Sequence, residues 1–158
     1  HPEAYRAWLE LIRAIRGQMD LRRCELATVA AARALKSTAC TVAHSKMLRD
    51  RFYETEQVIQ IATDHRHAGL DDVDVAVMDF AERVAERPSE IRRGEVESLK
   101  SLGLSDRDVL DVVLSVAARA FFTTIVDALD SPLEEELIED LEPELLEVLV
   151  VGRPLRPT

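Results

Sequence analysis

The sequence predicts an all-α domain of about seven or eight helices, and three observations support this prediction. Ala, Leu, Glu and Arg, which are all good helix formers, dominate the 158 residues. Apolar residues recur at helical spacing along most of the chain, and only five glycines and six prolines interrupt it. We find no segment with the apolar–polar alternation of a half-buried strand.

The first two helices follow from their start signals and their apolar stripes. Pro2 occupies a natural first helical position, and Gly17 ends the stripe that follows it. Asp20 is a plausible N-cap for a second helix that runs to about Lys36. Glu25 lies at the edge of the second apolar stripe, so we expect its side chain to face partly inward.

The middle of the chain predicts three more helices. Ser37 or Thr38 caps a third helix, and a fourth covers about residues 54–63. The polar segment 64–69 is predicted to be a loop. A fifth helix then begins at residue 71 or 72, with its apolar side formed by Val75, Met78, Phe80 and Val84.

The last third begins with a short connector at Pro88 and a helix near residues 95–102 that ends at Gly103. Residues 105–108, Ser-Asp-Arg-Asp, resemble a helix start, with a serine at the cap and acids in the first turn. Residues 109–129 are apolar almost all round, and we interpret them as a buried central helix. Pro132 is expected to open an acidic terminal helix with a break near Pro143.

Composition narrows the range of functions. The net charge of −10 argues against nucleic acid or an anionic membrane as the main partner, because both require a positive surface. Two cysteines are too few for a disulfide framework, so a reducing cytoplasm is the default compartment.

Cys40 and His44 are the first candidates for chemistry. Their four-residue spacing places both side chains on one helix face, where the histidine can accept the thiol proton. Cys40 also lies in the first turn, where the helix dipole favours a thiolate. Ser37 lies one turn earlier, and its hydroxyl can hydrogen-bond the sulfur or a bound oxidant. Taken as a lone pair, a structural cysteine and a surface histidine are the commoner interpretation.

A wider pattern of residues favours a reactive cysteine over a structural one. The residues Glu25-x11-Ser37-x2-Cys40-x3-His44 resemble the signature of the AhpD-like, carboxymuconolactone decarboxylase superfamily, whose peroxidase branch has Glu-x11-Cys-x2-Cys-x3-His. Residues 79–84 and 104–111 are similar to segments of its peroxidase-related subgroup. The resemblance covers roughly residues 1–130 and implies an AhpD-like helical bundle. Residues 131–158 lie outside it, and we expect this acidic helical extension to pack on the same domain or on a neighbouring subunit.

The resemblance implies a role for each residue of the pattern. Cys40 matches the cysteine that attacks the peroxide, His44 the histidine that activates it, and Glu25 the glutamate that shuttles protons through that histidine. Ser37 matches the second cysteine, but a serine cannot close a disulfide. Ala39 replaces a histidine often found between the two cysteines. The self-contained dithiol cycle is therefore not expected.

The function that follows is a thiol-dependent (alkyl)hydroperoxide reductase-like antioxidant protein with a single reactive cysteine, reduced by an external thiol or dithiol. In a variant of this reading Cys24 resolves the oxidised Cys40, although a small core residue is the better interpretation of Cys24. No metal or organic cofactor is implied. The family resemblance suggests a homo-oligomer: a trimer, dimer or hexamer.

Two alternatives remain open. The first is a carboxymuconolactone decarboxylase-like lyase or isomerase that uses His44 and Glu25 as acid and base, and Cys40 argues mildly against it. The second is a non-catalytic oligomeric helical interaction protein. Peroxide consumption that depends on Cys40 separates the peroxidase from both.

Several other polar and aromatic residues have less specific interpretations. Asp64, His65 and His67 alternate in a polar segment without further ligands nearby in sequence, so we interpret them as a solvated loop rather than a metal site. Arg119 lies within the apolar helix and needs either a route to solvent or a partner, for which Glu25 and Asp127 are the candidates.

Phe121 and Phe122 can line a substrate pocket, but we expect core packing for both.

Overall fold

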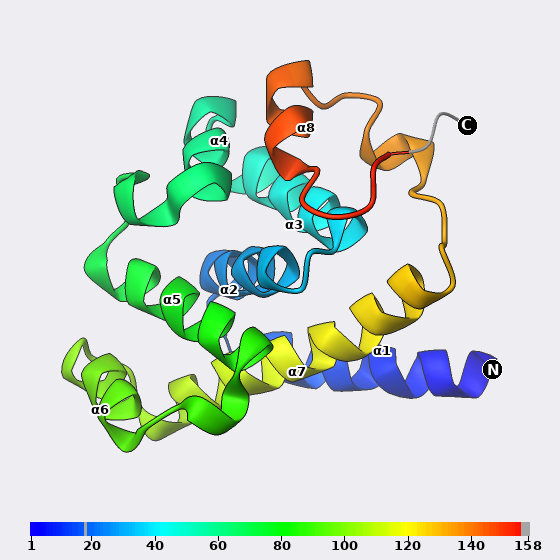
Figure 1. The fold of residues 1–158 in the computed structure, drawn as a ribbon. Helices are drawn as coiled ribbons and strands as arrows, with labels where there is room; N and C mark the ends of the chain where they lie inside the picture. The colour runs from blue at the N-terminus through cyan, green and yellow to red at the C-terminus, as the bar shows by residue number, and fades with distance from the viewer. Residues whose placement is uncertain (18, 156–158) are drawn as a thin grey trace.

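The computed structural model describes residues 1–17 and 19–155, and within them it contains eight α-helices and no strand (Figure 1). The helices are α1 (Pro2–Arg16), α2 (Leu21–Ala34), α3 (Thr38–Arg51), α4 (Thr55–Asp64), α5 (Asp72–Glu86), α6 (Arg93–Ser101), α7 (Asp106–Ala128) and α8 (Pro143–Leu149). Three short 3-10 helices join them: η1 (His65–His67), η2 (Pro88–Glu90) and η3 (Glu135–Leu137). The predicted all-α fold is confirmed.

Helix α2 is the centre of the molecule, and α3, α5 and α7 pack around it (Figure 1). Every residue from 24 to 32 is buried. Alanines at positions 27 and 30–32 let neighbouring helices approach closely, while Leu26 and Val29 fill the space between them. Glu25 lies within this stretch, so the fold places a carboxylate in the core.

The first turn of α2 is fixed by two sets of polar contacts. The Asp20 side chain accepts a hydrogen bond from the backbone N–H of Arg23, as expected of an N-cap. Asp74 on α5 is fully buried and binds two guanidinium groups of α2, at 2.6 Å from Arg22 and 2.7 Å from Arg23. These ion pairs set the position of α2 one turn before Glu25.

The turn between α2 and α3 is held by the C-terminal segment. Lys36 has a left-handed backbone conformation with φ of 56°. Gly152 lies so close to it that a Cβ at this position would be 1.8 Å from the Lys36 carbonyl oxygen. The Gly152 N–H also donates to Oγ1 of Thr38, over 3.1 Å, at the start of α3. The C-terminal segment is thus fastened beside the turn that precedes Cys40.

The expected terminal helix from Pro132 is wrong. Only η3 forms between this proline and Pro143, where α8 begins. Residues 134–140 carry five acidic side chains and no basic one, so a continuous helix would place like charges one turn apart. Asp140 and Glu142 instead bind Arg49 of α3, at 2.8 and 3.0 Å. Helix α8 packs on α3 and α4, with Leu145 and Leu149 fully buried.

Helix α7 is only partly the buried central helix that its composition predicts. Of the described helices it alone is long and apolar enough to cross a membrane, and its most apolar stretch is 44% buried. It packs on α2 with one face and on α1 with another. Phe122 stacks on Trp8 of α1 with ring centroids 4.5 Å apart, but Phe121 is 52% exposed, so its predicted core packing is wrong.

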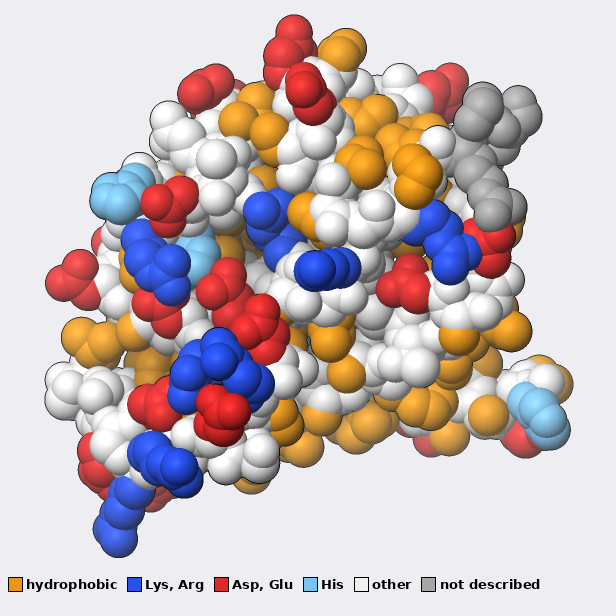
Figure 2. All heavy atoms as spheres, in the orientation of Figure 1, with side chains coloured by type: hydrophobic (Ala, Val, Ile, Leu, Met, Phe, Trp, Pro, Cys, Tyr) orange, Lys and Arg blue, Asp and Glu red, His pale blue; other side chains and the backbone are white. Residues whose placement is uncertain are grey.

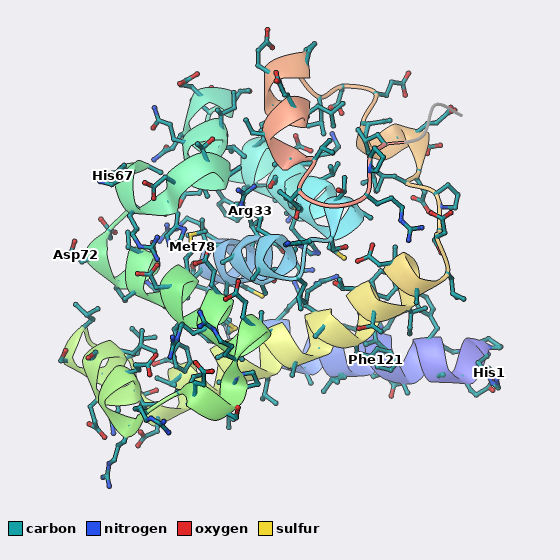
Figure 3. All side chains as sticks on the ribbon, in the orientation of Figure 1. His1, Arg33, His67, Asp72, Met78 and Phe121 are labelled. Carbon is teal, nitrogen blue, oxygen red and sulfur yellow. The ribbon has the colours of Figure 1, made fainter. Side chains whose placement is uncertain are left out.

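The outer faces of α1 and α7 form a continuous apolar surface. Their exposed large hydrophobic residues are Tyr5, Leu11, Leu110, Leu114, Phe121 and Ile125. Figure 2 shows hydrophobic side chains along this edge of the molecule, and Phe121 lies on the side of α7 that faces away from α2 (Figure 3). We call this set of residues the α1–α7 face.

Candidate active site

Glu25 and His44 meet across the contact between α2 and α3. The Glu25 side chain is 1% exposed and that of His44 is 13% exposed. The imidazole Nδ1 lies 2.5 Å from Oε2 of Glu25. Arg16 of α1 donates to the other carboxylate oxygen, Oε1. Three helices therefore bring a carboxylate, an imidazole and a guanidinium into one buried group.

The surroundings fix the protonation of this group. Burial by itself would raise the pKa of Glu25, but the hydrogen bond from His44 and the charges of Arg16 and Arg119 outweigh it, so this pKa lies below its usual value. Burial lowers the pKa of His44, against the opposing effect of Glu25. At neutral pH Glu25 is ionised and His44 is neutral. A carboxylate only accepts hydrogen bonds, so Nδ1 carries the proton and Nε2 can accept one.

Cys40 lies in the first turn of α3, four residues before His44, and is 4% exposed. Its Sγ accepts a hydrogen bond from the hydroxyl of Thr123 on α7, at 3.1 Å. This contact joins α7 to the first turn of α3 at the sulfur atom. The sulfur thus lies on the helix face that also carries His44, with a hydroxyl donor supplied by α7.

Ser37 is placed as the N-cap residue of α3, but its hydroxyl does not act as predicted. The side chain is fully buried, and Oγ has no hydrogen-bond partner among the described residues. The expected hydrogen bond from Ser37 to the Cys40 sulfur is therefore wrong, while its alternative, a hydrogen bond to a bound oxidant, stays a prediction. The position that the resemblance matches to a second cysteine is filled here by a small buried residue with no hydrogen bond to the thiol.

Cys24 is separate from Cys40. It is 4% exposed, and its Sγ lies 3.9 Å from the hydroxyl of Ser115. Ser115 and Thr123 are two turns apart on α7, about 12 Å along the axis, so the two sulfur atoms stay at least about 5 Å apart. Both thiols are free, and burial raises the pKa of Cys24. This geometry opposes a Cys24–Cys40 disulfide.

A small cavity of about 10 Å³ adjoins the Glu25–His44 pair. Its lining includes Arg119, Cys24 and Ser115, with Ile12 and Ile15 of α1 on the apolar side. The expected ion pair of Arg119 with Glu25 or Asp127 is wrong, because Arg16 holds Glu25 and no described carboxylate pairs with Arg119.

Three residues of this site were not predicted from the sequence: Arg16, Ser115 and Thr123. Ser115 and Thr123 do leave a signal in the sequence. They belong to a row of polar residues at four-residue intervals in an apolar helix: Asp111, Ser115, Arg119 and Thr123.

The segment at η1 differs from the predicted solvated loop. His65 is buried, and its Nε2 lies 2.8 Å from Oδ1 of Asp79, whereas His67 is exposed at the edge of the molecule (Figure 3). His65, Asp79 and Glu82 place one possible ligand atom each within 4.8 Å of one another. They can in principle hold a divalent cation, but Arg66 already contacts Asp79 at 2.5 Å and supplies a positive charge there.

Comparison with known proteins gives a family match and several similar folds. A sequence model of the carboxymuconolactone decarboxylase family matches residues 2–87, which include Glu25, Cys40 and His44. No curated protein matches the chain.

Three solved structures are similar in fold. A peroxidase-related protein with an alkylhydroperoxidase AhpD core, from Ralstonia eutropha JMP134, is 23% identical with a TM-score of 0.80, over 87% of this chain and 74% of that one. A peroxidase-related protein from Silicibacter sp. TM1040 is 21% identical with a TM-score of 0.81, over 87% and 73%.

The debrominase Bmp8 in complex with 2,3,4-tribromopyrrole is 15% identical with a TM-score of 0.78, over 94% and 78%. At these identities the three likenesses establish a shared fold.

Proposed function

This chain belongs to the carboxymuconolactone decarboxylase family, and we propose that it is a thiol-dependent peroxidase with one reactive cysteine, Cys40. One observation carries the proposal: His44, oriented by the buried carboxylate of Glu25, lies on the same face of α3 as Cys40. A nucleophile, a base and a group that orients the base are the parts that covalent catalysis needs.

The proposed reaction begins with transfer of the Cys40 thiol proton to Nε2 of His44. Glu25 stabilises the imidazolium through Nδ1. The thiolate then attacks the terminal oxygen of the peroxide, so that an S–O bond forms while the O–O bond breaks. The sulfur is oxidised to a sulfenic acid and the peroxide is reduced. The leaving oxygen takes the proton back through the Glu25–His44 relay.

An external thiol or dithiol then reduces the sulfenic acid. Ser37 has no sulfur, and the geometry around Cys24 opposes a disulfide with Cys40. The reductant attacks the oxidised sulfur, water leaves, and a second thiol releases Cys40 from the mixed disulfide. We propose this external step in place of the two-cysteine cycle.

A lyase or isomerase reaction is the second candidate. The cavity beside Glu25 and His44 is lined by this acid–base pair and not by Cys40, which suits proton transfer without a thiol. Its volume of about 10 Å³ is far below the size of an organic lactone. The debrominase has a similar fold, so reactions other than peroxide reduction are possible on this architecture.

Peroxide consumption with dithiothreitol as reductant tests the proposal. We expect Cys40→Ser to abolish thiol-dependent consumption of hydrogen peroxide. Cys24→Ser is the matched control, since it makes the same change at the other buried thiol and should keep most of the activity. Equal activity of the wild type and Cys40→Ser would overturn the peroxidase proposal and favour the acid–base alternative or a non-catalytic interaction protein.

A further inference from the structure

Helix α7 buries a row of polar residues although it is otherwise apolar. The row consists of Asp111, Ser115, Arg119 and Thr123, none of which is more than 7% exposed. Intervals of four residues place them along one face of the helix. Ser115 contacts the sulfur of Cys24 and Thr123 that of Cys40, so Arg119 lies between these two contacts.

Arg119 is the unsatisfied member of this row. Its Nε is buried without a hydrogen bond, and none of the described residues forms an ion pair with its guanidinium. The guanidinium lies over the ring of Trp8, whose centroid is 5.9 Å from Cζ. A buried charge is costly unless an anion compensates it, and Glu25 already binds Arg16 and His44. The position therefore calls for an anion from outside the chain.

The space beside Arg119 limits the size of that anion. The cavity measures about 10 Å³ and is lined by Arg119 together with Glu25 and His44. A volume of roughly 10–15 Å³ holds a single water molecule. The ligand that fits is one oxygen atom with its hydrogens, and the cavity is too small for an organic carboxylate or a phosphate.

The site has two levels along the contact between α3 and α7. Cys40 and Thr123 form the first level. His44 is one helical turn after Cys40 on α3, and Arg119 is one turn before Thr123 on α7, so each lies about 6 Å from the first level along its own helix. Both line the cavity, and the charge of Arg119 contributes to lowering the pKa of His44. Cys40 itself does not line the cavity, so a peroxide whose near oxygen is at the sulfur can reach this second level only with its far oxygen.

We infer that Arg119 is a catalytic residue that stabilises the leaving oxygen of hydrogen peroxide, an inference that rests on the proposed peroxidase function. As the Cys40 thiolate bonds to one oxygen, the O–O bond breaks and its electron pair moves to the other. The hydroxide formed there lies between Arg119 and His44. It takes the proton that His44 received from the thiol and leaves as water. The positive charge of Arg119 thus stabilises the negative charge that develops on the leaving oxygen.

The same cavity assigns the substrate. With hydrogen peroxide the leaving group is a hydroxide, which fits a space of about 10 Å³. With an alkyl hydroperoxide the leaving group is an alkoxide, whose carbon chain needs more space than this volume offers. The protein should therefore react with hydrogen peroxide in preference to bulky organic hydroperoxides.

Two rate constants measured on the same variants test the role of Arg119. Arg119→Met removes the charge and keeps most of the volume, and it should lower the rate of Cys40 oxidation by hydrogen peroxide roughly 10²–10³-fold. Alkylation of Cys40 by iodoacetamide releases no oxygen anion and should change less than about threefold by the same reasoning. Arg33→Met, which removes a partly buried guanidinium outside the site, is the control and should leave both rates unchanged.

The outcomes separate the two proposals. Equal peroxide rates in the wild type and Arg119→Met, or an equal fall in both reactions, would overturn the role of Arg119. If that variant does not fold, Arg119→Lys decides, with an expected fall of about tenfold in the peroxide reaction alone.

Cumene hydroperoxide should react at least about tenfold more slowly than hydrogen peroxide in the wild type, and equal rates would overturn the substrate assignment. A wild type that is alkylated but reacts with neither peroxide overturns the proposed function itself.

Discussion

The hydroxyl of Thr123 on α7 donates a hydrogen bond to the sulfur of Cys40 on α3, over 3.1 Å and across 83 residues of sequence. Hydrogen bonds to charged acceptors contribute about 1.5–3 kcal/mol, so this contact can stabilise the transition state in which the sulfur attacks. The nucleophile is therefore positioned by α7 as well as by its own helix.

Thr123→Val keeps the shape of the side chain and removes the donor. We expect the rate of Cys40 alkylation by iodoacetamide at pH 7 to fall about tenfold, in line with the loss of one hydrogen bond to a charged sulfur. The control is Thr124→Val, because the Thr124 hydroxyl is exposed and bonds the carbonyl of Ala120. Identical rates for the two variants would show that Thr123 does not act on the thiolate.

Glu25→Gln should impair the reaction of Cys40 with hydrogen peroxide without unfolding the protein. An amide can donate to Nδ1 of His44, which moves the imidazole proton to Nε2 and blocks the base. Loss of general base catalysis lowers rates by roughly 10²–10⁴. The comparison is made at pH 7, because at high pH a thiol ionises without a base. A rate at pH 7 equal to that of the wild type would show that Glu25 does not orient the base.

The Glu25–His44 pair makes the free energy of unfolding depend on pH. The pKa of His44 lies below its ordinary value of 6.5, so as the pH falls below 6.5 the unfolded chain binds a proton that the folded state resists. The pKa of Glu25 lies below its ordinary value of 4.5, so its stabilising contribution is present above pH 4.5 and is lost as the pH falls through the folded value. The positive charges of Arg16 on α1 and Arg119 on α7 contribute to lowering both pKa values.

Urea unfolding at a series of pH values measures this dependence. The free energy of unfolding of the wild type should begin to decrease below pH 6.5 and decrease further below pH 4.5. His44→Gln lacks the first titration, so the difference in stability between wild type and variant should change between pH 7 and pH 5. A difference that is constant over this range would contradict the lowered pKa of His44.

The C-terminal segment offers a test of the turn that precedes Cys40. In Gly152→Ala the new methyl group would overlap the carbonyl of Lys36, which is backbone and cannot rotate away. We expect a loss of about 1–3 kcal/mol in the free energy of unfolding. Gly94→Ala is the control, since nothing lies within 4 Å of its Cβ position and alanine is the better helix former. A neutral Gly152→Ala would show that this segment is not fastened at the turn.

The order of the helices and the shared face of Cys40 and His44 could be predicted from the sequence because the signals are local, whereas the pairing of Glu25 with His44 across two helices followed only from the family resemblance. Caps, glycines and apolar stripes mark helices from Pro2 to Leu129, and a four-residue spacing places Cys40 and His44 on one face. The helix expected from Pro132 failed because propensity ignores the repulsion among its acids. That repulsion left the segment to be shaped by its contacts with α3.

The remaining site residues depend on how the helices cross. Arg16 reaches Glu25 from the end of α1, a helix that packs on α7, and Thr123 reaches Cys40 because α7 meets α3. No local pattern fixes these crossings. The row of polar residues on α7 indicates that one of its faces meets a polar site, but the pairing of Arg119 with Glu25 was wrong because a closer guanidinium from α1 holds that carboxylate.

The α1–α7 face leads to a prediction about assembly. It combines exposed residues such as Leu114 and Phe121 with a groove of about 410 Å³ between the two helices, and a monomer rarely exposes a continuous apolar surface of this kind. We propose that a second copy of the chain covers it. Phe121→Glu should shift the protein toward the monomer in sedimentation velocity, because it buries a charge in the interface. Leu102→Glu, at an exposed leucine after α6, is the matched control and should leave the assembly unchanged. A wild type that sediments as a monomer at all concentrations would rule out this interface.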